Sequence, residues 1–234
     1  CVIPIGHSEG GLIALAAMAR FPDACGVILI ASVGRPLDTV IRAQLHANPA
    51  NAPLLEEADA ALATLRRGAR VDAGAISPAL RPLFASEVQG FLIDAFSYDP
   101  LQLAAQVQFP LLVVQGTRDL QVGIADARML ADAAPDATRA LGPDVNHVLK
   151  TVASEDPSAN LATYADPDLP VAPAVVDAIA DFVARLRTDW THKATFVAVA
   201  GGPVPGSRRG QDLLSARQTL GPASVSLEPQ VPCE

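Results

Sequence analysis

The chain has 234 residues, of which 50% are hydrophobic, 18% are charged and 4% are aromatic, and its formal net charge is −8. The apolar fraction is ample for a buried core and excludes a wholly disordered chain. The acidic balance and the lack of any run of Lys and Arg make a nucleic acid an unexpected partner. No apolar stretch approaches the roughly 18 residues of a membrane-spanning helix. Three scattered cysteines are too few for a disulfide framework or a zinc site.

Residues 1–31 predict a β-α-β unit. An apolar run at 2–5 leads into Gly6-His7-Ser8-Glu9-Gly10-Gly11, and an Ala- and Leu-rich stretch follows at 12–20. This order indicates a strand, a sharp turn and a helix. A second apolar run at 26–31 does not alternate with polar residues, which is typical of a strand covered on both faces of a parallel sheet. We therefore expect an α/β fold.

The block at 35–108 has a different pattern, with helical periodicity and no predicted strand. Its best helix carries apolar residues on one face, acidic residues in its first turn and basic residues in its last. Helices or helical pieces are expected at 36–47, at 54–67, from Ser77 and Arg81 onward, and at 84–96. This block is predicted to be a helical insert between two strands.

The rest of the chain returns to the α/β pattern and then loses it. The expected elements are a buried strand at 110–116, a helix at 124–134, a short strand at 138–141 and a final helix at 172–187. Residues 201–234 contain five Gly and five Pro, a composition typical of flexible segments. We expect no function for the tail at 188–234, which is predicted to be disordered or unrelated.

The pattern Gly6-x-Ser8-x-Gly10 stands between the first predicted strand and helix. Small residues two positions before and after the serine remove Cβ clashes in the tight turn that projects its hydroxyl. The helix that follows directs its free N–H groups at the serine, and the backbone N–H of Glu9 is the expected oxyanion donor. The pattern favours a nucleophilic serine over a glycine-rich turn with a bystander serine.

A nucleophilic serine needs a base, and His147 is the best candidate. It lies in a loop just after a predicted strand, at the sheet edge where an α/β fold gathers its site. The side chain of His7 is expected to point away from Ser8. His46, in the helical insert, and His192, near the tail, are expected to be surface or packing residues.

The acid that orients the base is expected to be Asp119. It follows the strand at 111–115 through a short turn, which places its carboxylate at the same sheet edge as Ser8 and His147. Asp144 is a weaker alternative because it is close to His147 in sequence. Three further carboxylates on or after the next helix are expected to be solvated: Asp126, Asp132 and Asp136.

The segments at 6–11, 110–119 and 146–147 resemble the nucleophile, acid and histidine segments of α/β-hydrolases, and the order Ser, Asp, His agrees. The helical insert lies where this superfamily commonly carries a lid or cap. Within it, the sequence is most similar to bacterial serine esterases and serine aminopeptidase-like hydrolases. The resemblance covers about residues 1–187 and implies a mostly parallel sheet flanked by helices.

In that fold the serine turn normally follows the fifth strand of an eight-stranded sheet, whereas Ser8 lies near the start of this chain. We therefore expect an N-terminally truncated hydrolase, the C-terminal portion of the fold, with no counterpart of the loop that gives the second oxyanion donor. The expected division is a hydrolase core at 1–34 and 109–187, a lid or cap at 35–108, and the tail at 188–234. No targeting segment can be read, so the localisation stays open, with the cytoplasm favoured.

The resemblance implies a serine hydrolase that cleaves a carboxylic ester through Ser8, His147 and Asp119, on a small-molecule ester or acyl substrate and without a metal or organic cofactor. The alternatives are a peptidase, thioesterase or acyltransferase on the same triad, or a catalytically impaired fragment or binding module. The oligomeric state and the substrate-binding residues stay open. Five apolar side chains of the insert either line a pocket or only pack the lid onto the sheet: Leu83, Phe84, Phe91, Leu92 and Phe96.

Overall fold

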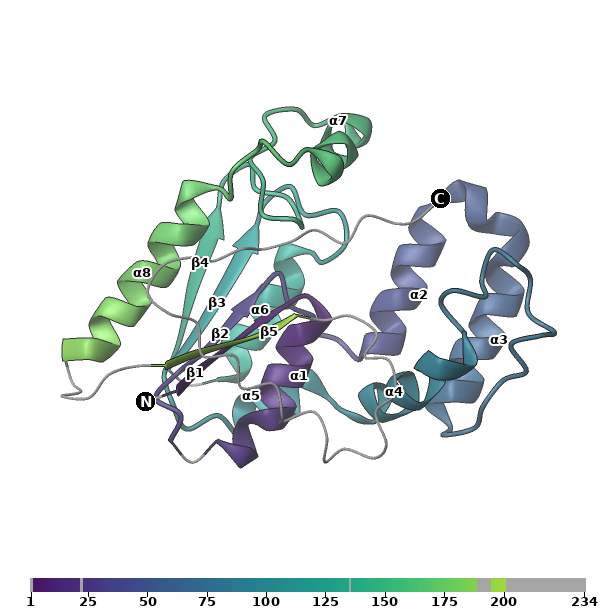
Figure 1. Cartoon of the computed structure of the whole chain (residues 1–234), viewed down its shortest axis with the longest axis horizontal. Coiled ribbons are helices and arrows are strands. Elements are labelled where there is room, and N and C mark those ends of the chain that lie inside the picture. The colour runs from purple at the N-terminus through teal and green to yellow at the C-terminus, as the bar shows by residue number, and fades with distance from the viewer. Residues whose placement is uncertain (1, 22, 135, 189–194, 201–234) are drawn as a thin grey trace.

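A parallel sheet forms the centre of the protein (Figure 1). The computed structural model describes residues 2–21, 23–134, 136–188 and 195–200. Five strands lie in the order β4-β3-β2-β1-β5, and every neighbouring pair is parallel. The strands are β1 (Val2–His7), β2 (Val27–Ile30), β3 (Leu111–Gly116), β4 (Ala137–Gly142) and β5 (Thr195–Ala200). The predicted α/β class with a mostly parallel sheet is confirmed.

One strand lies where the sequence predicted only a tail. β5 pairs in parallel with β1 along the whole length of both strands. Its sequence, Thr-Phe-Val-Ala-Val-Ala, is rich in residues that favour strands, and β1 offers it an edge with unpaired backbone groups. The other residues after Thr188 lie outside the described part of the chain.

Helices cover both faces of the sheet because the buried strands are apolar on both sides. α1 (Glu9–Ala17), α5 (Pro100–Ala105) and α6 (Ile124–Ala133) cover one face, and α8 (Pro173–Thr188) covers the other (Figure 1). The strand residues that pack toward α1, α5 and α6 are Val27, Leu29, Leu111 and Val113. Their neighbours along the strands pack toward α8: Ile28, Ile30, Leu112 and Val114. This alternation is the period of two that a strand imposes.

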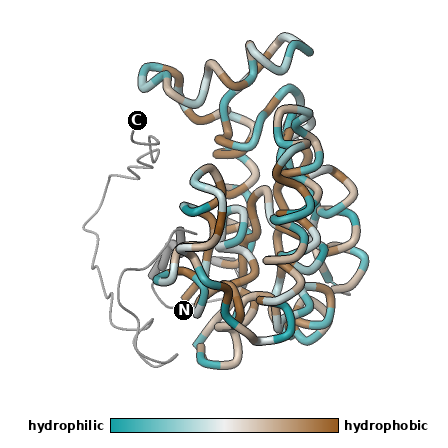
Figure 2. Tube along the Cα trace, turned by 90° about the vertical axis from the view of Figure 1, so that its right-hand side faces the viewer, coloured by the Kyte–Doolittle hydropathy of each residue, from teal (hydrophilic) through white to brown (hydrophobic). Residues whose placement is uncertain are grey.

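The block between β2 and α5 folds into a helical cap. Its helices are α2 (Leu37–Ala47), the 3-10 helix Pro49–Leu54, α3 (Leu55–Arg66) and α4 (Ser86–Ser97). Figure 2, which faces this side, shows apolar and polar residues alternating along the chain. The cap shares an apolar core with the main body: the same cluster contains Phe84, Leu92 and Phe96 from the cap and Leu12, Val33 and Val122 from the segments beneath it. Phe84, Leu92 and Phe96 are buried in that cluster, so they pack the cap onto the main body, whereas Leu83 and Phe91 are only partly buried at its margin.

Two local predictions in or beside the cap were incomplete. The pieces expected from Ser77 and Arg81 are turns, with bonds such as Leu80 N–H to the Ser77 carbonyl. Pro82 interrupts the first piece, because a proline cannot donate a backbone hydrogen bond within a helix. The short helices α5 and α7 (Pro157–Ala162), the latter followed by the 3-10 turn Thr163–Ala165, were not predicted. Each of these helices begins with an Asp N-cap followed by Pro, a signal present in the sequence.

Asp126 corrects a further expectation, since its side chain is buried rather than solvated. It is 1% exposed and accepts hydrogen bonds from Arg35 Nε and Nη2, both at 2.9 Å, and from Gly34 N–H at 3.0 Å. A Cβ on Gly34 would lie 2.4 Å from the Asp126 carbonyl oxygen, so only glycine permits this approach. The pair ties the segment that enters the cap to the first turn of α6. Asp132 and Asp136 are exposed, as predicted.

Candidate active site

Ser8 occupies a strained turn between β1 and α1. Its φ of 57° and ψ of −124° lie in a region that residues with a side chain rarely adopt, and such a conformation costs about 1–3 kcal/mol. The turn is held by a hydrogen bond from Ser8 N–H to the Ile30 carbonyl at 2.9 Å. A Cβ on Gly6 would lie 2.2 Å from the Gly10 carbonyl oxygen, so the close approach of strand and helix requires glycine there. The sequence motif thus forms the sharp turn that was predicted.

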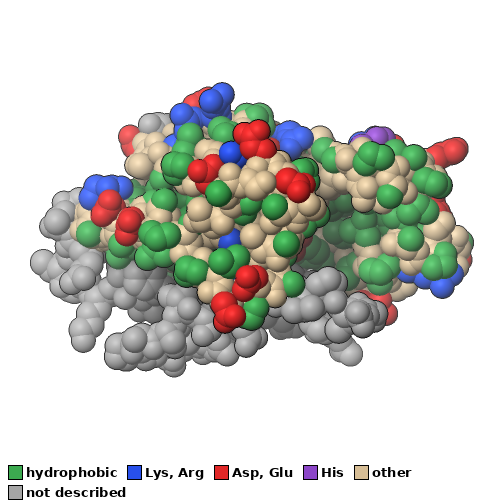
Figure 3. Space-filling view, turned by 90° about the horizontal axis from the view of Figure 1, so that it is seen from above, with side chains coloured by type: hydrophobic (Ala, Val, Ile, Leu, Met, Phe, Trp, Pro, Cys, Tyr) green, Lys and Arg blue, Asp and Glu red, His purple; other side chains and the backbone are tan. Residues whose placement is uncertain are grey.

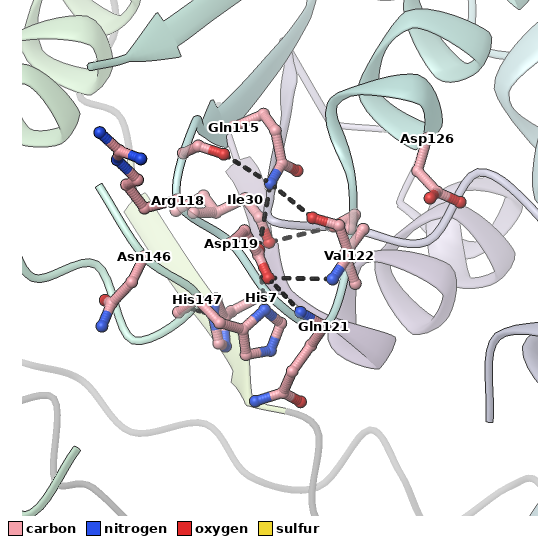
Figure 4. Close-up of polar contacts among 12 residues, drawn as sticks. His7, Ile30, Gln115, Arg118, Asp119, Gln121, Val122, Asp126, Asn146 and His147 are labelled. Carbon is pink, nitrogen blue, oxygen red and sulfur yellow. Dashed lines mark hydrogen bonds and ion pairs between the residues drawn. The ribbon is translucent and has the colours of Figure 1, made fainter. Parts of the chain in front are cut away.

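Asp119 and His147 form a buried pair. His147 Nδ1 lies 2.9 Å from Asp119 Oδ2, and the side chains are 6% and 0% exposed respectively. The backbone N–H groups of Gln121 and Val122 donate to Asp119 Oδ1 at 2.8 and 2.9 Å, and Gln115 Nε2 donates to Oδ2 at 3.0 Å (Figure 4). A carboxylate that accepts from every side acts as an acceptor toward His147 as well. The proton of His147 therefore lies on Nδ1, and its Nε2 keeps the lone pair that a base needs.

Gln115 is a site residue that the sequence analysis missed. Its Nε2 also donates to the carbonyls of Val122 and Gly116, at 2.9 and 3.2 Å, so three acceptors fix the orientation of the amide. Its Oε1 is buried and has no hydrogen-bond partner in the described part of the protein, an arrangement that costs about 1–3 kcal/mol. A polar residue inside the apolar strand that leads to Asp119 was the available signal.

The loop that carries His147 is braced against the loop of Asp119. Arg118 N–H donates to the Val145 carbonyl at 2.9 Å, and a Cβ on Gly116 would lie 2.1 Å from that same oxygen. Asn146 is fully buried, and its Nδ2 donates to Thr163 Oγ1 at 2.7 Å and to Asn160 Oδ1 at 3.1 Å. The backbone just before the histidine is therefore held from both the end of β3 and the α7 region.

His7 points to the candidate base. Its Nε2 lies 2.8 Å from the His147 carbonyl oxygen, and the two rings are 4.9 Å apart at an angle of 47°. Burial is the main cause that lowers the pKa of His7 below its ordinary value, and the neighbouring His147 lowers it further. The sequence predicted only that this side chain avoids Ser8, and it gave no indication of this contact.

Ser8 and Glu9 stand at the start of α1. The Glu9 N–H is the first of the helix, so it has no acceptor within the helix and is free for a ligand. Burial raises the pKa of the Glu9 carboxyl. No hydrogen bond joins the Ser8 hydroxyl to His147 within the described residues, but His7, the residue before Ser8, contacts His147 directly. Catalytic contacts of this kind often tighten only when a substrate binds.

The alternative site residues lie elsewhere. Asp144 contacts Arg118 Nε at 3.1 Å rather than the imidazole, and its side chain is 49% exposed. His46 is 45% exposed and pairs with Asp59 on the surface. His192 lies outside the described residues. Of the carboxylates considered, the structure brings Asp119 to His147.

The described residues around the site leave a hollow beside it. Figure 3 shows a hollow between the main body and the cap, with hydrophobic side chains on its walls. A separate groove of about 210 Å³, lined by residues such as Met18 and Phe109, lies at the end of α1 away from Ser8. Within the described part of the chain, His, Cys, Asp and Glu do not gather in a group of three or more that could hold a metal ion. Nor does any described helix combine the length and apolarity needed to cross a bilayer.

Comparisons with known proteins gave only structural matches. No family model and no curated protein matches the sequence. A putative non-heme bromoperoxidase from Mycobacterium tuberculosis is 21% identical with a TM-score of 0.41, over 79% of this chain and 67% of that one. The esterase domain of a Rhodothermus marinus protein is 20% identical with a TM-score of 0.40, over 79% and 59%. Alpha/beta hydrolase domain-containing protein 10 from mouse is 19% identical with a TM-score of 0.43, over 79% and 62%.

The chain thus spans between 59% and 67% of the length of these three structures. Its own geometry defines its fold. A parallel sheet is covered by helices on both faces, a strained serine turn joins β1 to α1, and a carboxylate after β3 pairs with a histidine after β4. Sites at the carboxyl ends of parallel strands are the rule in α/β proteins, and a serine on such a turn is specific to one group of them. The described part of the chain has the α/β-hydrolase fold, with a helical cap.

Proposed function

We propose that this protein is a serine hydrolase that cleaves carboxylic esters, with Ser8 as nucleophile, His147 as base and Asp119 as the acid that orients the base. The observation that carries the proposal is the buried Asp119–His147 pair. The backbone carbonyl of His147 is hydrogen-bonded to His7, the residue that precedes Ser8. A structural ion pair would not need a neighbouring serine in a strained conformation. Strain of this kind gathers at active sites, where it is part of the mechanism.

The geometry supports a two-step reaction. His147 Nε2 takes the proton of the Ser8 hydroxyl as Oγ attacks the ester carbonyl, and the Glu9 N–H stabilises the oxyanion that forms. The imidazolium gives that proton to the leaving alcohol when the C–O bond breaks, which leaves an acyl group on Ser8. A water molecule, activated by His147, then releases the carboxylic acid and restores the serine. Asp119 stabilises the imidazolium in both steps.

The apolar hollow between the cap and the main body favours an acyl group as its occupant, so carboxylic esters are the first substrates to test. The same triad could also cleave amides or thioesters or transfer the acyl group to an acceptor other than water. Two of the similar solved structures are described as an esterase domain and an esterase.

The test is covalent labelling by a fluorophosphonate probe, followed by hydrolysis of a series of p-nitrophenyl esters and aminoacyl amides. We expect labelling of the wild-type chain and none of Ser8→Ala, and faster turnover of esters than of amides. Asp144→Asn is the matched control, because it alters an exposed carboxylate of the same loop region. Labelling that persists in Ser8→Ala, or an unlabelled wild-type chain, would contradict the proposal.

A further inference from the structure

His7 lies between the candidate nucleophile and the candidate base. It is the last residue of β1 and immediately precedes Ser8, and it reaches across 140 residues of sequence to His147. We infer that His7 is a positioning residue, which locks the backbone of His147 to the serine turn and so holds the base in register with the nucleophile. The inference rests on the proposed function and assigns to it a fourth side chain.

The chemistry of the contact fixes the state of His7. A backbone carbonyl only accepts hydrogen bonds, so the hydrogen bond of 2.8 Å requires a proton on His7 Nε2. His7 is therefore the donor, and it ties the carbonyl of His147 to β1. The side chain of His147 is tied elsewhere, since its Nδ1 is hydrogen-bonded to Asp119.

These two bonds act on different degrees of freedom of His147. The bond to Asp119 fixes the rotation of the imidazole but would let it move together with its loop. The bond from His7 fixes the loop relative to the turn that carries Ser8. In addition, the His7 ring packs against the His147 ring at 4.9 Å, which limits its movement on that side. Asp119, the partner of the His147 imidazole, follows β3 and so does not connect His147 to β1.

A neutral His7 also suits the charge that develops during the reaction. His147 becomes an imidazolium when it takes the serine proton, and a second positive charge beside it would oppose that step. Burial, and then the proximity of His147, lower the pKa of His7 and so favour its neutral form; they outweigh the hydrogen bond to the His147 carbonyl and the charge of Asp119, which act in the opposite direction. His7 can thus donate to the carbonyl of His147 without repelling its protonated ring.

The test compares two amides that differ by one methylene. His7→Gln can place an N–H near the position of Nε2, whereas His7→Asn reaches only the position of Nδ1. We expect kcat on a p-nitrophenyl ester, per labelled serine, to stay close to wild type in His7→Gln. It should fall by roughly 10- to 100-fold in His7→Asn, because a displacement of about 1 Å has effects of that size. His46→Asn, which changes an exposed histidine, should leave kcat unchanged.

A second readout does not depend on activity. Nitrogen NMR of the imidazole of His147 reports the tautomer and the motion of this ring, which a merely structural role of His7 would leave unchanged in folded protein. We expect wild-type signals in His7→Gln. In His7→Asn we expect the same tautomer, which Asp119 holds, but broadened ring signals, because the loop that carries the ring is no longer tied to β1. Equal kcat and equal NMR spectra of this ring in the two variants would overturn the inference. An unlabelled wild-type chain in which the NMR difference persists would instead overturn the proposed function and keep the role of His7.

Discussion

Replacing Asp119 by asparagine would reverse the polarity of one hydrogen bond and leave the shape of the site unchanged. Asp119 Oδ1 accepts from the backbone N–H groups of Gln121 and Val122, so the amide oxygen of the substituted side chain must take that place. The amide nitrogen then takes the place of Oδ2 and presents its hydrogens to His147 Nδ1. To avoid a clash of two donors, His147 must move its proton to Nε2. It then has no lone pair toward Ser8.

The size of the effect follows from this tautomer change. In the protease in which an equivalent change is known, a wrong tautomer lowers kcat about 10⁴-fold, which corresponds to about 5.4 kcal/mol of transition-state energy at about 1.36 kcal/mol per factor of ten. The fold should survive. Gln115 Nε2, which loses its acceptor at Oδ2, keeps the carbonyls of Gly116 and Val122.

The assay is the rate of p-nitrophenyl ester hydrolysis for wild-type, Asp119→Asn and Asp144→Asn protein, with thermal unfolding of each variant as a check on folding. We expect a loss of about 10⁴-fold for the first variant and no loss for the second. If folded Asp119→Asn retained activity within a factor of about ten, the assignment of Asp119 as the orienting acid would be refuted. An equal loss of activity in Asp144→Asn and Asp119→Asn would refute the choice of Asp119 over Asp144 as the orienting acid.

Three further changes test other parts of the structure. Asp126→Ala leaves Gly34 N–H unsatisfied and Arg35 unpaired. Because the Arg35 side chain is 35% exposed, we expect the free energy of unfolding in urea to fall by about 3 kcal/mol, the low end for a broken buried pair. A fall of less than about 0.5 kcal/mol would contradict this expectation. Ser8→Gly removes a side chain from a conformation with φ of 57°. It should be inactive like Ser8→Ala, but its free energy of unfolding should exceed that of Ser8→Ala by about 1 kcal/mol or more, which raises its unfolding temperature. The reverse order would mean that the turn is not strained. Burial raises the pKa of the Glu9 carboxyl, so the folded protein binds this proton more tightly than the unfolded chain, and stability falls as the pH rises through the carboxyl range. Glu9→Gln should therefore unfold at a higher temperature than wild type at neutral pH, and at the same temperature in acid. A difference in unfolding temperature that does not depend on pH would show another cause.

Local signals were sufficient for most of the fold. The serine turn was predictable because its requirement for Gly6 arises between groups close in sequence, the turn itself and the helix that begins there. Strands β1, β2 and β3 were visible as apolar runs, since both faces of a covered strand need apolar residues. The position of Asp119 directly after β3 followed from the same pattern. The helix expected from Ser77 was wrong because Pro82 follows soon after, and a proline inside a helix interrupts it.

The remaining features depend on residues far apart in the chain. Asp126 was expected in solvent because the periodicity of its helix cannot show that Arg35, 91 residues earlier, provides a buried partner. The pairing of β5 with β1 depends on which edge of the sheet is open.

By itself, the sequence determined which residues could act as nucleophile, base and acid, because each follows a strand and strand ends are set by local propensity. Only the tertiary structure decided how they are held. It chose Asp119 over Asp144 as the partner of His147, brought Gln115 to the carboxylate and turned His7 toward the base. Such contacts are made by side chains and loops that meet only when separate strands pair, so their distances and directions are properties of the assembled sheet.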